Sequence, residues 1–398
     1  MERPQTGGFF SALSTLLSPF IRLLDRPALP QYEGTLTLPS LHQSVTIQWQ
    51  SHGIPNVSAA NQRDLFFAQG YLHAQERLWQ MDMNRRFLTG RMAEVFGNFP
   101  LPWRELTSQF RGRDSGDFDY FMRLIGIRQA ALDSLELLSE DERGCLDAYS
   151  EGVNSYIERC GKKPPWEFRL LRYDAEPWRP QDSLTISKGF SLLVSPALFT
   201  RLNILALAAR LDGQTEKLRS LLPAYPAGEP TTTRALWDST EGLWRFFNGA
   251  FAAADRLGAG QGSNSWVVAP HRSASGNSLL CNDPHLRLTL PAVWYSMHLR
   301  SEPEAAQPDG YEAWGASIPG VPGIQVGHNR WLAWGVTASL CDDVEIYREK
   351  IHRLEPDCYL AGHQWRSMVR RDETIRMRGG AAVDRGVRLT RHGPVISD

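Results

Sequence analysis

The sequence predicts an α+β protein with a mainly helical first half and mostly antiparallel strands in the second. Two observations predict this. Apolar residues recur at helical spacing from Asn61 to Leu211, whereas beyond Gly262 short alternating runs are separated by glycine-rich turns. The glycine-rich segment 258–262 lies between the two patterns. The sequence shows no repeat at the periods of solenoids or propellers, and this order of elements is typical of the α+β class.

Length and composition restrict the class of protein further. The chain has 398 residues, enough for two or three domains, and 42% of them are hydrophobic, as in globular proteins. Its 43 Lys and Arg are balanced by 44 Asp and Glu, so no basic field for nucleic acid is present. No stretch reaches about 18 uninterrupted apolar residues, which excludes a membrane span. We expect a small, locally recognised partner molecule.

The helical half is expected to begin after a short stretch of strand. Residues Thr35–Leu38 and Ser44–Trp49 alternate in hydrophobicity and predict two antiparallel strands. The region from Asn61 to Phe96 predicts one long helix, or two helices joined near Gly90.

Further helices are expected beyond this region. The stretch Asp119–Cys160 predicts two helices, and Asp182–Leu211 predicts another after a proline-rich break. Within the first long helix, His73 and Glu76 lie three residues apart on one face. Because no third ligand lies nearby in the sequence, we interpret them as part of a hydrogen-bonded helix face rather than a metal site.

Beyond the glycine-rich segment the sequence predicts a series of strands. Trp266–Val268 and Leu279–Cys281 flank a turn-rich stretch and are expected to form a hairpin. Ile324–Val326 and Trp331–Val336 predict a second hairpin. Three more strands are expected, at Val344–Tyr347, Thr374–Met377 and Val387–Thr390.

The first 33 residues and the cysteines say little about the cellular compartment. The apolar run Phe9–Leu17 lacks a basic start and a clear small-residue cleavage site, so a weak export signal and an amphipathic packing helix both remain open. The five cysteines form no Cys-x-x-Cys pair, and we assign them no catalytic role.

The junction Gly262–Ser263 is where the sequence indicates chemistry. A serine nucleophile needs a base, but the second glycine of a G-x-S-x-G elbow is missing here and no S-x-x-K pair lies in a helical frame. A third solution uses the serine's own α-amine, which requires the preceding peptide bond to be cut. Gly262 suits this solution because glycine tolerates the strained backbone of an N→O acyl shift. The released amine would have a pKa of about 8, near working pH.

Several blocks of the sequence resemble the penicillin acylase family of N-terminal nucleophile hydrolases. The helical blocks Gly70–Asp82 and Gly90–Glu94 resemble the α chain of that family. The later matching blocks are Gly262–Trp266, Asn282–His285, Pro322–Gly323 with Gly327–Asn329, Trp334–Ala338 and Asp342–Glu345. The resemblance extends from about Thr35 to the end of the chain.

The resemblance implies both a fold and a reaction. The fold would be a four-layer αββα sandwich with a helical α-chain domain around it, and the reaction would be hydrolysis of a linear amide through an ester on Ser263. The released amine of Ser263 would be the base, and the Ala338 N–H would stabilise the oxyanion. His285 would hydrogen-bond the Ser263 amine and the scissile carbonyl. Asn264 and Asn282 would support the nucleophile.

The resemblance also suggests a substrate. Leu286, Val326 and Trp294 are expected to line the acyl pocket. Together with His285, Leu286 and Val326 favour an aliphatic acyl chain, as in N-acyl-homoserine lactones, over a phenylacetyl group. The expected partner is therefore a small acyl amide.

No cofactor is expected to be required, although some family members bind calcium. The matching residues are Asp342, the Val344 carbonyl and Glu345, whose oxygen atoms suit a hard cation. The α-chain glutamate that completes that site falls on Arg201, whose charge would repel the metal.

Finally, the resemblance divides the chain. It implies a leader at 1–33, a helical α chain at 34–222, a linker or spacer at 223–262 and the first part of a β chain at 263–398, with α and β chains cut from one precursor. A periplasmic location is favoured over a cytoplasmic one.

The family's second oxyanion donor, an Asn side chain, and a substrate-orienting Arg would lie beyond Asp398, so we expect a C-terminally truncated chain and an incomplete sheet. The alternative is a catalytically silent family member or binding module.

Overall fold

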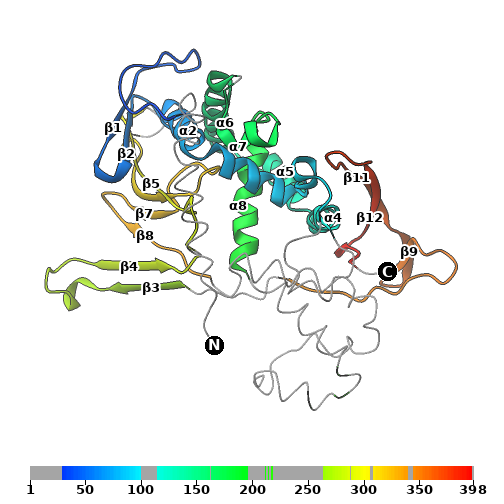
Figure 1. The fold of residues 1–398 in the computed structure, drawn as a ribbon. Helices are drawn as coiled ribbons and strands as arrows, with labels where there is room; N and C mark the ends of the chain where they lie inside the picture. Colours follow the sequence, from blue (N-terminus) through cyan, green and yellow to red (C-terminus); the bar gives the residue numbers. More distant parts are fainter. Residues whose placement is uncertain are drawn as a thin grey trace, which may run out of the picture. The chain divides into compact units, whose positions relative to one another are not determined.

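The computed structural model describes residues 29–99, 114–161, 163–195, 263–286, 288–304, 308–338 and 344–396, with residues 211, 214 and 217. Its helices and strands are drawn in Figure 1. The chain divides into two compact units, which we describe separately. The described residues of unit 1 fall within 1–85, 132–186 and 289–334, and those of unit 2 within 86–131, 187–288 and 335–398.

A six-stranded sheet lies at the centre of unit 1, in the order β1-β2-β5-β6-β7-β8 (Figure 1). Its neighbouring strands are antiparallel except β2 and β5, which run parallel. The sheet therefore joins strands from the first and second halves of the sequence. The strands are β1 (Val45–Trp49), β2 (Pro55–Ala59), β5 (Tyr295–Ser301), β6 (Glu312–Ser317), β7 (Val326–His328) and β8 (Ala333–Trp334).

The long helix α2 (Gln62–Thr89) supplies much of the core of unit 1. Leu65 and Leu72 of α2 belong to one buried apolar cluster with Met297 and Leu299 of β5. Burying these side chains stabilises the unit by about 1.5–3 kcal/mol each. The packing of helix on sheet is what ties the two halves of the sequence together.

Helix α6 (Glu140–Cys160) lies against α2 at two glycines. A Cβ atom added to Gly70 of α2 would lie 2.1 Å from the Tyr149 carbonyl oxygen, and one added to Gly152 of α6 would lie 1.9 Å from the Phe67 carbonyl oxygen. Only glycine allows the two backbones to approach so closely. The N-terminus of α6 carries a capping box between Ser139 and Glu142, which fits the acidic residues expected there.

The other helices are shorter. α3 and α4 are separated from α2 by Gly90, whose φ of +64° ends the long helix where the sequence predicts a break. The remaining bounds are α3 (Ala93–Phe96), α4 (Ser115–Ile125), α5 (Ile127–Glu136), α7 (Trp166–Leu171) and α8 (Pro180–Val194), with 3₁₀ turns η2 (Ser51–Gly53) and η4 (Pro270–Arg272). None of the described helices is long and apolar enough to cross a membrane.

His73 of α2 lies at the centre of a buried chain of hydrogen bonds. The Gly320 N–H donates to the Tyr149 hydroxyl, so that this hydroxyl donates in turn to His73 Nδ1 at 2.7 Å. His73 Nε2 then donates to the Ser317 hydroxyl at 2.9 Å, and Ser317 donates to the Tyr295 carbonyl. The chain is complete only with a neutral ring, and burial lowers the pKa of His73 to about 3. The predicted hydrogen-bonded helix face is therefore confirmed.

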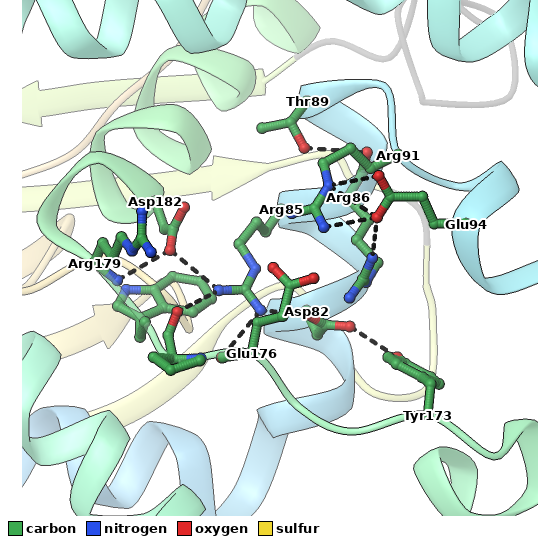
Figure 2. Close-up of polar contacts among 12 residues, drawn as sticks. Asp82, Arg85, Arg86, Thr89, Arg91, Glu94, Tyr173, Glu176, Arg179 and Asp182 are labelled. Atoms are coloured by element: carbon green, nitrogen blue, oxygen red, sulfur yellow. Dashed lines mark hydrogen bonds and ion pairs between the residues drawn. The ribbon is translucent and has the colours of Figure 1, made fainter. Parts of the chain in front are cut away.

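Two ion clusters lie near the end of α2 (Figure 2). In unit 1, the buried Arg85 donates to the carboxylates of Asp82 and Asp182, and its guanidinium lies over the Trp178 ring at 5.0 Å. In unit 2, Glu94 accepts from Arg86 and Arg91 (Figure 2). The Arg85 cluster joins α2 to Asp182, 97 residues further along the chain, whereas the Glu94 cluster is local and joins the end of α2 to α3.

The described residues of unit 2 form three smaller sheets and include helices α3 and α4. Helix α4 packs on β11, where Arg123 pairs with Glu373 at 3.2 Å and the Tyr120 hydroxyl donates to the Gly386 carbonyl. Asp119 of α4 accepts from the backbone N–H groups of Met92 and Ala93, and burial raises its pKa to about 6. The strands are β3 (Ser263–Val268) with β4 (Leu279–Pro284), β9 (Cys358–Ala361) with β10 (Gln364–Ser367), and β11 (Val369–Ile375) with β12 (Val383–Thr390) and β13 (Gly393–Pro394).

Three predicted elements are wrong. Thr35–Leu38 forms no strand, and β1 pairs instead with β2, which follows the tight turn at Ser51–Gly53. Val344–Tyr347 also forms no strand, because alternation alone supplies no partner. Asp119–Cys160 falls within three helices rather than two, since Gly126 adopts the left-handed conformation and ends α4.

The main expectation about the fold is confirmed, because both units mix helices and sheet as an α+β protein does. The hairpins predicted at Trp266–Cys281 and Ile324–Val336 are present as β3–β4 and β7–β8. The four-layer αββα arrangement and the precursor boundaries at 33, 222 and 262 stay predictions. The predicted linker 223–262 lies outside the described residues, as does the part of the helix predicted at Asp182–Leu211 that covers residues 196–210.

Candidate active site

The candidate site is built on the β3–β4 hairpin of unit 2. Ser263 is the first residue of β3 and pairs with Pro284, the last residue of β4. The antiparallel register continues through Asn264 opposite Asp283 and Ser265 opposite Asn282. The hairpin thus brings Ser263 next to the Asn282–His285 block, which the sequence places about twenty residues away.

The two faces of the hairpin carry different groups. Since side chains alternate along a strand and paired residues share a face, Ser263 lies on the face of Asn282, and Asn264 on the face of Asp283. His285 makes its contacts on the second face. Its Nε2 lies 2.9 Å from a carboxylate oxygen of Asp283 and 3.5 Å from the side-chain nitrogen of Asn264.

The contact with Asp283 assigns one hydrogen of the His285 ring. A carboxylate only accepts, so Nε2 carries the hydrogen that is donated to Asp283. The His285 and Asp283 side chains are 42% and 70% exposed, and water therefore weakens the attraction between them. This pairing orients the imidazole without burying a charge.

The segment Gly335–Ala338 lies along the same hairpin. Asn282 Nδ2 donates to the Val336 carbonyl at 3.0 Å, and Asn282 Oδ1 accepts from the Val336 N–H at 3.2 Å. Asn282 Nδ2 also lies 3.1 Å from the Asn264 carbonyl oxygen, and the Thr337 hydroxyl lies 3.4 Å from the Ser263 carbonyl oxygen. The backbone that leads to Ala338 is thereby held beside the start of β3.

The predicted site residues divide between the two units. Ser263, Asn264, Asn282, His285 and Ala338 belong to unit 2. Leu286 follows in the same unit and is half-buried, with its N–H on the Pro284 carbonyl. Val326 begins β7, and Trp294 directly precedes β5, both in unit 1. A pocket that includes all three stays a prediction.

The calcium site also stays a prediction. Val344 and Glu345 lie in a described segment without regular structure, whereas Asp342 and Arg201 lie outside the described residues. Within the described part of the chain, no group of three or more His, Cys, Asp or Glu side chains could hold a metal ion. The described residues therefore provide only part of the expected ligand set.

Sequence reasoning missed the roles of Asp283, Gly335, Val336 and Thr337. All four lie inside the motif blocks Asn282–His285 and Trp334–Ala338, yet their contacts depend on how the two blocks meet in space. Gly335 left one signal, because a glycine within an otherwise strand-like run indicates a close backbone approach.

The chain resembles known proteins over most of its length. A family model described as penicillin amidase matches residues 44–398. The chain is 32% identical over 380 residues to the acyl-homoserine lactone acylase QuiP of Pseudomonas aeruginosa, an alignment that covers 93% of this chain and 42% of that protein. It is 30% identical over 381 residues to the penicillin acylase 2 proenzyme of Pseudomonas sp. strain SE83, covering 93% of this chain and 46% of that protein.

A solved structure of the thermostable penicillin G acylase from Alcaligenes faecalis also matches, at 28% identity and a TM-score of 0.38, over 49% of this chain and 99% of that chain. The chain thus spans less than half the length of the two curated relatives named above. Because the family model extends over most of the chain and includes the whole β3–β4 site, the chain belongs to the penicillin amidase family.

Proposed function

We propose that this chain is an acylase that hydrolyses linear amides, with Ser263 as its nucleophile. The observation that carries the proposal is the hairpin, in which the pairing of β3 with β4 sets Ser263 beside the Asn282–His285 block. The same hairpin holds the backbone before Ala338 through Asn282. Acyl transfer requires a nucleophile, a base and an oxyanion donor, and these would be the Ser263 hydroxyl, the released Ser263 α-amine and the Ala338 N–H.

The nucleophile is released by cleavage of its own chain. The Ser263 Oγ attacks the Gly262 carbonyl, the C–N bond breaks, and the acyl group moves from nitrogen to oxygen. Water then hydrolyses this ester, leaving a carboxylate on Gly262 and a free α-amine on Ser263. Gly262 itself lies outside the described residues, so this step rests on the sequence and the family.

The amide substrate follows an analogous course. The α-amine of Ser263 takes the proton of its own hydroxyl as Oγ attacks the substrate carbonyl, and the Ala338 N–H stabilises the oxyanion. Collapse of this intermediate breaks the C–N bond, and the departing amine takes the proton. Water hydrolyses the acyl ester to a carboxylic acid and restores the hydroxyl. His285 contacts Asp283 and Asn264 on the opposite face of the hairpin, so its ring would have to turn toward Ser263 to hold the amine and the scissile carbonyl in place.

An N-acyl-homoserine lactone is the substrate that we favour, over a penicillin with a phenylacetyl group. The apolar residues Leu286 and Val326 suit an aliphatic chain, and the relative from Pseudomonas aeruginosa is named for that substrate class. Because another relative is named a penicillin acylase, the assay also includes a phenylacetyl amide for comparison.

The test uses the mass of the purified chain and its turnover of two chromogenic amides, one with an aliphatic and one with a phenylacetyl acyl group. The wild type should appear as two fragments, one beginning at Ser263, and should hydrolyse the aliphatic amide faster. The variant Ser263→Ala should remain a single inert chain. Ser265→Ala, two residues along the same strand, is the matched control and should behave like the wild type.

Two results would overturn the proposal. A wild-type chain that stays whole and inert would indicate the catalytically silent alternative. A Ser263→Ala variant that is still cut and still active would exclude this nucleophile.

A further inference from the structure

We propose that Asn282 and Gly335 form a lock that positions the Ala338 N–H relative to Ser263. The inference deepens the proposed acylase function and rests on it. Both residues act through the backbone between them, so they are positioning residues rather than catalytic ones.

The first half of the lock is the Asn282 carboxamide. Its oxygen and nitrogen pair with the N–H and C=O of Val336, as a neighbouring strand would do with its own backbone. The same Nδ2 also lies within reach of the Asn264 carbonyl on β3. The Asn282 side chain therefore links β3, β4 and the segment that contains Ala338. Asn is the only residue whose side chain carries an amide at this length, so no other residue makes all of these contacts.

The second half is Gly335, which permits the approach. A Cβ atom at this position would lie 2.7 Å from both Cβ and Cγ of Asn282 and 3.0 Å from Oδ1. Separations below 3.0 Å force something to move. The glycine is needed for space and not for an unusual φ, because its backbone lies outside the positive-φ region.

The consequence concerns the oxyanion donor. Val336 is held by two hydrogen bonds, and Thr337 contacts the Ser263 carbonyl, so Ala338 follows a backbone fixed at both preceding residues. An oxyanion donor must lie about 2.7–3.1 Å from the position that the developing negative charge occupies. A shift of Val336 would move that donor without touching the nucleophile.

The test compares Gly335→Ala, Asn282→Gly and the double variant in the amide assay. Removing one oxyanion donor costs about 100- to 1,000-fold in kcat, and we expect its displacement to cost at least about tenfold, with KM changed less than about threefold. In the Asn282→Gly background the atoms that clash are gone, so Gly335→Ala should add little further loss. Asn277→Gly in the hairpin turn and Gly144→Ala in α6, where an added Cβ meets nothing within 4 Å, are the controls.

A second measurement separates the two proposals. Hydrogen exchange of the Val336 amide should be faster in Asn282→Gly than in the wild type, whether or not the chain turns over. Wild-type exchange and wild-type kcat in both single variants would overturn the lock. An inert wild-type chain whose Val336 amide is protected by Asn282 would instead refute the acylase proposal and leave the contact standing.

Discussion

Replacing Gly152 with alanine tests how closely α2 and α6 pack in unit 1. The added Cβ would lie 1.9 Å from the Phe67 carbonyl oxygen and 2.9 Å from the Tyr71 nitrogen. Ordinary carbon contacts are about 3.5 Å, so the two helices must separate by more than about 1 Å. Overpacking of this kind lowers the unfolding free energy by about 3 kcal/mol, at the upper end of its usual range. The higher helix propensity of alanine raises it by about 1 kcal/mol. We expect a net loss of about 2 kcal/mol.

Gly144 lies in the same helix and provides the matched control. An alanine there meets no atom within 4 Å and gains the same helix propensity, so that gain cancels when the two variants are compared. Urea unfolding followed by circular dichroism should place Gly152→Ala about 3 kcal/mol below Gly144→Ala. Equal stability of the two variants, within about 0.5 kcal/mol, would refute the close helix crossing.

Three further predictions concern buried polar groups. Burial holds the pKa of His73 near 3, whereas an unfolded histidine takes up a proton below about 6.5. The unfolding free energy of the wild type should therefore fall by about 2 kcal/mol between pH 7 and pH 5, and that of His73→Gln should not. Parallel curves of unfolding free energy against pH for the two proteins would contradict this. Asp119 acts with the opposite sign, because its pKa in the folded protein is raised to about 6. Its contribution to the unfolding free energy, about 2 kcal/mol, is present at pH 4 and is lost as the pH rises to 7. The variant Asp119→Asn should not show this loss. Arg85→Lys should lower the unfolding free energy by about 2–3 kcal/mol, since a lysine does not bridge Asp82 and Asp182 as the planar guanidinium does. Arg300→Lys is the control, because its pair with Glu302 is exposed and 3.9 Å long, and it should change the unfolding free energy by less than about 0.5 kcal/mol. Similar shifts of the melting temperature in both variants would count against a structural role of the Arg85 cluster.

Local patterns in the sequence predicted the elements whose stability is mostly local. The long helix from residue 62 and its end at Gly90 follow from apolar spacing and a glycine with positive φ. The β3–β4 and β11–β12 hairpins follow from alternation around turn residues. Two of the three errors fall where a partner strand decides, at Thr35–Leu38 and Val344–Tyr347, and the third falls where Gly126 ends α4 within the stretch Asp119–Cys160.

By itself, the sequence determined the α+β class and the family, and it proposed Ser263, Asn282 and His285 for the candidate site, because motif identity and periodicity are properties of neighbouring residues. Only the tertiary structure decided that β2 pairs with β5, that His73 completes a buried hydrogen-bond chain, and that Gly335 lies against Asn282. These contacts join residues far apart in the chain. Their energies depend on distances and burial that folding creates, and a local pattern such as Gly335 in a strand-like run indicates a close approach without naming the partner.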